Sequence, residues 1–222
     1  MIIIGICGNE QTSHIIAILR KITGNMDIKT SIIESYDSHS STPPASTLKG
    51  YINELDKNNI EIAVIKITSE KAWEGIYNNI NFNILVYDSV ENTSENIFDS
   101  KKTSDFRKVF ELMGKESIAI VNNDDSTVLQ LLKGCKMCVI TYGLSSKVTI
   151  TASSIDQDLQ SSSMNYCLQR IITTFDKRDI EPQEFPIKIS STTDKEIYAI
   201  LVAVTIAIIC GIDIQAISQM IL

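Results

Sequence analysis

The chain begins with a glycine-containing turn whose residue types could bind phosphate. An apolar run over residues 2–6 leads into Gly5-Ile6-Cys7-Gly8-Asn9-Glu10-Gln11-Thr12-Ser13, and a helical pattern follows. In a phosphate-binding loop between a strand and a helix, backbone N–H groups surround the phosphates, a lysine reaches the β/γ oxygens, and a Ser or Thr hydroxyl holds Mg²⁺. The candidate nucleotide-binding residues are therefore Gly8, Asn9, Glu10, Gln11, Thr12 and Ser13.

This turn lacks the positive charge that phosphoryl transfer requires. Thr12 and Ser13 keep their hydroxyls, but Gln11 stands at the lysine position and one glycine is missing. A glutamine supplies no charge to a transferring phosphoryl group, and Glu10 adds a negative one. We interpret the turn as a vestigial nucleotide site. The alternative role of the two hydroxyls is to cap the helix that begins there.

The composition is that of a globular protein with a substantial core. The 222 residues are 44% hydrophobic and carry a net charge of −7, which predicts one domain over residues 1–222 and disfavours nucleic acid and anionic membranes as partners. No basic region precedes the first apolar run, and the apolar run over residues 197–212 is shorter than the roughly 20 residues that a membrane span needs. We expect a cytoplasmic protein in which that run is a buried helix.

The cysteine pattern does not indicate a metal site. The chain has five cysteines, with Cys135 and Cys138 forming the one C-x-x-C pair, while His14 and His39 are distant in sequence. A zinc site needs a second pair of ligands nearby. We expect reduced thiols in the core, with metal or redox use of the pair as the alternative, and we assign no metal ligand.

The alternation of apolar and amphipathic segments predicts the fold class. Strands are expected at 2–6, 61–67, 83–87, 117–121 and 136–141, and helices at 12–22, 45–57, 101–113, 125–132, 196–210 and 213–220. Three antiparallel strands are expected at 147–151, 167–174 and 185–190. The prediction is an α/β fold: a three-layer, mostly parallel, doubly wound sheet of the P-loop NTPase type with a small antiparallel β extension. Ligands of such sheets bind at the carboxyl ends of the strands.

Several further motifs follow the turn in a fixed order. They are Ser41-Thr42-Pro43 before a helix, Val121-Asn122-Asn123-Asp124-Asp125, Thr141-Tyr142-Gly143, and a late helix from Tyr198 to Ile212. In this order and spacing the chain resembles the central, ATP-binding domain of the Mur ligases. That family makes peptidoglycan precursors by ATP-dependent amide-bond formation. The chain is most similar to the branch that adds the third amino acid to UDP-MurNAc-dipeptide.

The resemblance implies ligands and site residues. A functional site would take ATP and Mg²⁺, and a nucleotide or a UDP-sugar-peptide would be the ligand. The residues carried over for substrate binding are Ser41, Thr42 and Pro43. The N-terminal and C-terminal domains of the family have no counterpart in the sequence, so we expect that this chain by itself does not carry out the ligase reaction.

The departures from the family pattern fall on its chemistry. The family's Mg²⁺-binding Glu falls on Lys66, which either substitutes for the lost cation or is a structural, solvated lysine. The family's F-N-V-Y-N segment, with an asparagine that contacts adenine, falls on residues 195–199, where both asparagines are absent. Asp124 and Asp125 are interpreted as the N-cap of the helix at 125–132, with paired catalytic carboxylates as the alternative.

Three functional hypotheses follow. The first is a degenerate Mur ligase-like domain, a pseudoenzyme that serves as a binding or regulatory module with residual affinity for a nucleotide or a cell-wall precursor. The second is an ATP-dependent amide-bond ligase of the peptidoglycan-precursor type, completed by a partner chain, in which Lys66 replaces the loop lysine. The third is a structural fold whose apolar content forms an oligomer interface with other copies of itself. We assign no catalytic residue; Lys66 is carried forward as the candidate substitute cation.

Overall fold

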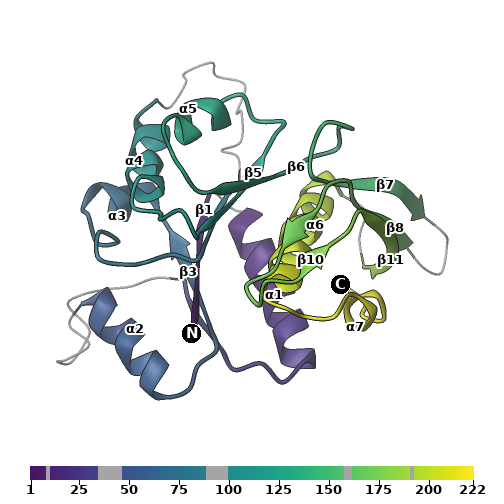
Figure 1. Ribbon diagram of the computed structural model, residues 1–222, viewed down its shortest axis with the longest axis horizontal. Helices are drawn as coiled ribbons and strands as arrows, with labels where there is room; N and C mark the ends of the chain where they lie inside the picture. Colours follow the sequence, from purple (N-terminus) through teal and green to yellow (C-terminus); the bar gives the residue numbers. More distant parts are fainter. Residues whose placement is uncertain (9–10, 35–46, 89–99, 158–161, 191–192) are drawn as a thin grey trace. The chain divides into compact units, whose positions relative to one another are not determined.

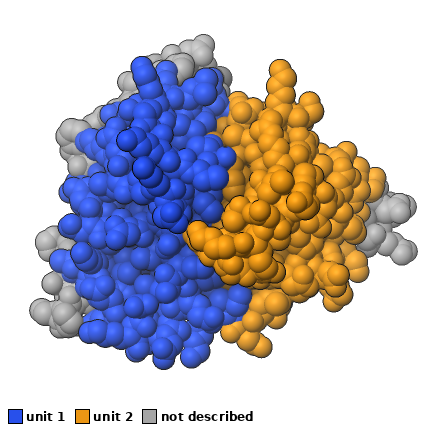
Figure 2. Space-filling model, viewed as in Figure 1, with its two compact units in different colours: residues 1–9, 28–119, 125–139 blue, residues 10–27, 120–124, 140–222 orange. Residues whose placement is uncertain are grey.

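The computed structural model describes residues 1–8, 11–34, 47–88, 100–157, 162–190 and 193–222 (Figure 1). The chain divides into two compact units (Figure 2). Unit 1 comprises residues 1–9, 28–119 and 125–139, and unit 2 comprises residues 10–27, 120–124 and 140–222. The strands β5 (Ile118–Asn122) and β6 (Cys138–Tyr142) each contain residues of both units.

Unit 1 is built on parallel strands in the order β4-β1-β3-β2. These strands are β1 (Ile2–Cys7), β2 (Thr30–Ile33), β3 (Ile62–Ile67) and β4 (Ile84–Tyr87). They read as almost continuous apolar runs because both faces are buried. After β1 the chain forms β2 and β3 on one side of that strand, and β4 then pairs with β1 on the other side. This reversal is the mark of a doubly wound sheet.

The helices of unit 1 that lie in the described residues are α2 (Leu48–Lys57), α3 (Ser69–Trp73), α4 (Ser100–Phe110) and α5 (Val128–Leu132). The buried Tyr87 of β4 contacts the rings of Phe106 and Phe110 edge-on, which fixes α4 over this strand. Tyr77, which follows α3, is also buried.

Unit 2 combines two packed helices with antiparallel strands. The helix α1 (Gln11–Asn25) packs against α6 (Asp194–Ile209). The strands β7 (Ile150–Gln157), β8 (Ser162–Leu168) and β11 (Gln183–Ile189) pair antiparallel in the order β11-β8-β7. The short strands β9 (Ile172–Thr173) and β10 (Asp179–Ile180) form a separate pair, and α7 (Ile214–Ser218) lies near the end of the chain.

The late apolar run forms α6, as expected. Its residues from Ala199 to Ile209 are buried on every side, which explains why the sequence shows no polar stripe there. Within the part of the chain that the structure describes, no helix has the length and apolar character needed to cross a membrane.

The predicted α/β class is confirmed, with its mostly parallel sheet and small antiparallel extension. Element boundaries differ in places. The single strand expected at 167–174 is interrupted, because β8 ends at Leu168 and β9 covers only Ile172–Thr173. The strand β2 and the short helix α3 were not expected, since neither is long enough to show a clear period.

Candidate functional site

The first candidate residues lie where β1 ends. Gly8 follows β1 with φ 153°, a backbone region that is almost restricted to glycine. Asn9 and Glu10 lie outside the described residues, and so does the side chain of Gln11. Because α1 begins at Gln11, Thr12 and Ser13 belong to its first turn and not to its N-cap. The first turn of a helix is the place where a bound anion can meet backbone N–H groups.

Lys66 is the charged residue of the neighbouring strand. It is the second-last residue of β3 and stands in register with Ile6 of β1. Lys66 is half-buried, whereas Ile65 and Ile67 on either side of it are fully buried. The Tyr77 hydroxyl donates to the Lys66 carbonyl at 3.5 Å. The strand register therefore places an ammonium-bearing residue beside the carboxyl end of β1.

Asp88 occupies the corresponding place on the other side of β1. It follows β4, its side chain is buried, and its N–H donates to the carbonyl of Cys7 at 2.9 Å. We call Gly8, Lys66 and Asp88 the strand-end cluster of unit 1. By contrast, the Thr68 hydroxyl accepts from Lys71 N–H at 3.4 Å and caps α3.

A second cluster in unit 2 joins two of the sequence motifs. Asp124 Oδ2 accepts a hydrogen bond from the Tyr198 hydroxyl at 2.8 Å and one from Leu144 N–H at 3.1 Å. A Cβ at Gly143 would lie 2.6 Å from the same oxygen, so this position accommodates no larger residue without movement. We call Asp124, Gly143, Leu144 and Tyr198 the Asp124 cluster.

Neighbouring contacts hold the Asp124 cluster in place. Asn123 N–H donates to the Tyr142 carbonyl at 2.9 Å, and the ring of the buried Tyr142 meets that of Tyr198 edge-on at 6.0 Å. The first turn of α6 is fixed by its own cap, in which Thr193 accepts from Glu196 N–H and donates to the Glu196 carboxylate. The structure therefore gives Glu196, at the position of a family asparagine, a capping contact.

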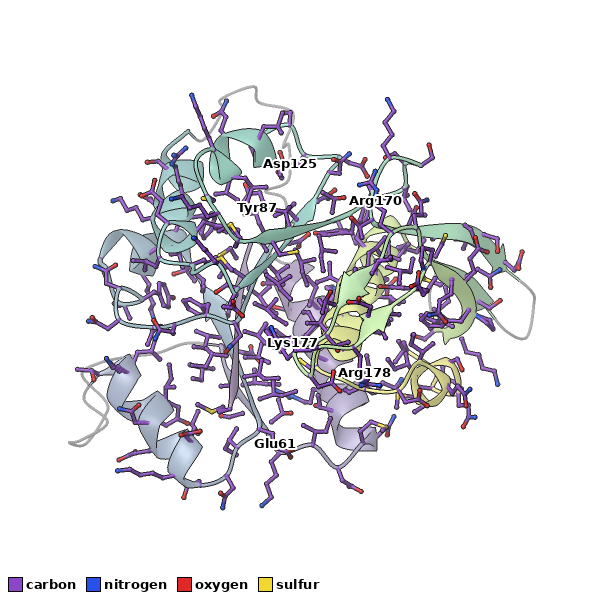
Figure 3. The ribbon with its side chains drawn as sticks, in the orientation of Figure 1. Glu61, Tyr87, Asp125, Arg170, Lys177 and Arg178 are labelled. Carbon is purple, nitrogen blue, oxygen red and sulfur yellow. The ribbon has the colours of Figure 1, made fainter. Side chains whose placement is uncertain are left out.

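The two adjacent aspartates have separate roles. Asp125 Oδ1 accepts from both the N–H and the hydroxyl of Thr127 at 2.8 Å, and that hydroxyl also meets Tyr87 Oη at 3.3 Å (Figure 3). The N-cap of α5 is Thr127, so the helix begins later than the expected residue 125. The N-cap prediction was wrong in detail: Asp125 holds the turn before the helix, and Asp124 holds the Gly143–Leu144 turn.

The cysteines occupy different environments. Cys7 and Cys167 are buried, Cys135 and Cys210 are half-buried, and Cys138 is exposed, so the expectation of core thiols was wrong for Cys138. Burial raises the pKa of Cys210 from 9.0 to about 12. The described residues contain no group of three or more His, Cys, Asp or Glu that could hold a metal ion. Ser41, Thr42 and Pro43 lie outside the described residues.

A family model shows what the chain is related to. The model of the Mur ligase middle domain matches residues 11–207. The chain belongs to this family. The expectation drawn from the motif order is thereby confirmed.

Several characterised Mur ligases are similar to the chain. A UDP-N-acetylmuramoyl-L-alanyl-D-glutamate–2,6-diaminopimelate ligase of Bacillus cereus is 23% identical over 173 residues, which are 69% of this chain and 34% of that protein. A solved structure of a ligase with the same name has a TM-score of 0.77 at 15% identity and covers 99% of this chain and 45% of its own. The MurF ligase of Thermotoga maritima in complex with ADP has a TM-score of 0.64 at 11% identity over 99% of this chain and 48% of that one. The chain thus spans between a third and a half of these relatives.

The strand-end cluster can be tested against the cofactors of such ligases. Mg²⁺ prefers several oxygen ligands in octahedral geometry, whereas the strand-end cluster contains one carboxylate, Asp88, and one cation, Lys66. An ammonium near the metal position repels a dication, so this donor set does not fit Mg²⁺. The same ammonium fits the phosphate groups of a nucleotide.

Sequence reasoning missed the function of Tyr198. It is 74 residues from Asp124, and no local pattern connects positions that far apart. The one available signal was that the two motifs and the late helix occur in a family order.

Proposed function

We propose that this chain is a Mur ligase-type middle domain that binds a ligand without forming an amide bond, and so serves as a binding or regulatory module. The observation that carries the proposal is the position of Lys66, a cation on the strand beside the carboxyl end of β1. A ligase that activates a carboxylate with ATP needs its metal held near the transferred phosphoryl group. The positive charge of Lys66 repels a metal cation at the carboxyl end of β1 and attracts the phosphate groups of a ligand.

The proposed ligand is a nucleotide or a cell-wall precursor that carries a diphosphate. The candidate contacts are the turn at residues 8–13 and the segment at residues 41–43. Gly8 supports the first of these, because its backbone conformation leaves no side chain where a phosphate would approach. We treat residues 1–222 as one middle-type domain.

The alternative is an ATP-dependent ligase of the peptidoglycan-precursor type that a partner chain or further domains complete. The Asp124 cluster favours this alternative, since two family motifs are held together by specific hydrogen bonds. In this reading Lys66 takes the place of the loop lysine. ATP and Mg²⁺ would be the cofactors of that reaction.

Calorimetry on the purified chain tests the proposal. We expect ATP, ADP or UDP-MurNAc-dipeptide to bind with a dissociation constant of roughly 100 μM or lower, equivalent to about −5.5 kcal/mol. No heat with any of the three at millimolar concentration would contradict the proposal. A mass in solution that rises with protein concentration, together with no ligand response, would favour the structural hypothesis instead.

A measurement of ATP hydrolysis distinguishes the binding module from the ligase. Phosphate release from ATP should stay at the background rate when the chain is alone. Release that requires the chain and disappears in Lys66→Ala would favour the ligase alternative. The matched control is Lys57→Ala, which removes an exposed lysine from the last turn of α2, away from the carboxyl end of β3.

A further inference from the structure

We infer that the strand-end cluster of unit 1 binds the phosphate groups of a diphosphate without a divalent cation, with Lys66 as the resident positive charge. This inference rests on the proposed function and specifies its chemistry. The shared ligand chemistry is two linked phosphate groups, whether they belong to a nucleotide, a UDP-sugar or free pyrophosphate.

The sheet itself fixes the position of Lys66. Its backbone pairs with β1 on one side and with β2 through its neighbour Ile65 on the other, so it stands on a central strand. The Tyr77 hydroxyl bonds its carbonyl. A group on a central strand is held more precisely than a group on a loop. Lys66 is therefore a fixed part of the sheet, near the carboxyl ends of the strands, where doubly wound folds bind ligands.

The surroundings of Lys66 favour an anion. Lys66 lies in sequence between two fully buried isoleucines and is itself half-buried, so it is partly removed from water one residue before β3 ends. Charge–charge attraction is stronger where water is partly excluded. Gly8 directly follows β1, the strand that pairs with β3, and has a backbone conformation that is almost restricted to glycine. Phosphate can approach such a backbone closely.

Two other roles for these residues make different predictions. A lysine that only covers apolar surface with its stem would be replaced by methionine without loss of binding. A metal-dependent site would use the Asp88 carboxylate as an oxygen ligand and would lose affinity when Asp88 becomes asparagine. In the metal-free site that we infer, Asp88 contributes only repulsion toward phosphate, so Asp88→Asn should keep or strengthen binding.

The experiment measures inorganic pyrophosphate binding by calorimetry in EDTA and again with excess Mg²⁺. We expect wild-type binding in EDTA, a loss of at least about tenfold in Lys66→Met, and affinity within about threefold of wild type in Lys66→Arg, because hydrogen bonds to charged groups account for such factors. Lys57→Met is the matched control and should bind like the wild type. Circular dichroism of each variant checks that it is folded. If Lys66→Met is not folded, Lys66→Gln, which also removes the charge but keeps a polar side chain, takes its place and should show the same loss.

The outcomes separate this inference from the proposed function. Binding of ADP or UDP-MurNAc-dipeptide that requires Mg²⁺ and is indifferent to Lys66→Met would overturn the inference and leave the proposed function standing. Absence of binding by all probes would overturn both. If Lys66→Met weakens the binding of pyrophosphate and ADP equally, the inference is supported and a nucleotide is a source of the diphosphate. If Lys66→Met weakens the binding of UDP-MurNAc-dipeptide and pyrophosphate but not that of ADP, the inference is supported and the diphosphate belongs to a UDP-sugar.

Discussion

The hydroxyl of Tyr198 donates a 2.8 Å hydrogen bond to the carboxylate of Asp124, joining the first part of α6 to the segment that follows β5. The same carboxylate oxygen accepts Leu144 N–H. One side chain thus connects three segments of unit 2 that are separated in sequence. These two hydrogen bonds tie the motif that contains Asp124 to the segment that follows Thr141-Tyr142-Gly143.

Removal of the Tyr198 hydroxyl should weaken unit 2. Tyr198→Phe leaves the ring against Tyr142 and deletes the hydrogen bond to Asp124. We expect a loss of about 1 kcal/mol in the free energy of unfolding, since the site is partly exposed to water. Urea denaturation measures it. Tyr51→Phe on α2 is the matched control and should change the value by less than about 0.5 kcal/mol.

A side chain at Gly143 should displace Asp124. Gly143→Ala places a Cβ 2.6 Å from Asp124 Oδ2, so the carboxylate must move away from Leu144 and Tyr198. The expected loss is about 1–3 kcal/mol. Gly24→Ala near the end of α1 meets no atom within 4 Å and should be neutral or slightly stabilising.

Coupling between these two changes can be measured directly. If Gly143→Ala already breaks the Asp124–Tyr198 bond, adding Tyr198→Phe should cost little more, and the double variant should be less destabilised than the sum. Strict additivity would show that the two residues act independently and would contradict the cluster as described.

Arg107 should stabilise the end of α5. Its guanidinium donates to the carbonyls of Gln130 and Lys133 at 2.7 and 2.8 Å and pairs with Glu111. Arg107→Lys loses the forked geometry, and we expect a cost of about 1 kcal/mol in urea denaturation. Glu111→Gln removes only the exposed ion pair and should cost less than about 0.5 kcal/mol. Equal costs would assign the effect to the ion pair.

The thiols should differ in reactivity and in their effect on alkaline stability. Iodoacetamide should modify the exposed Cys138 first and the buried Cys7 only after unfolding, as mass spectrometry of timed samples would show. Burial raises the pKa of Cys210 to about 12 from 9.0, so the folded state holds this proton more tightly than the unfolded state. The resulting stability is present below pH 9.0 and is lost as the pH rises toward 12. Cys210→Ala should make stability fall less steeply over that range.

The interpretation of residues 1–222 as one domain predicts a single unfolding transition. The only tryptophan, Trp73, belongs to unit 1, so its fluorescence reports that unit, whereas far-ultraviolet circular dichroism reports both. Coincident urea curves are expected for one cooperative domain. A fluorescence transition displaced from the dichroism transition would mean that the units unfold separately.

The sequence by itself determined the class of the fold and the family. Buried parallel strands read as apolar runs. The almost continuously apolar segment before Cys210 predicted a buried helix, because a helix without a polar face must be covered on all sides. The order of the motifs indicated the Mur ligase family, which the family match over residues 11–207 confirmed. These are properties of local composition and of order along the chain.

Only the tertiary structure decided what individual polar residues do. Asp124 and Asp125 are adjacent and chemically identical, yet one holds a distant turn and the other holds the turn before α5. The position of Lys66 beside β1 depends on strand order and register, which bring together residues sixty positions apart. Local periodicity carries no information about such pairings, because they form only when the strands have found their neighbours and the side chains their partners.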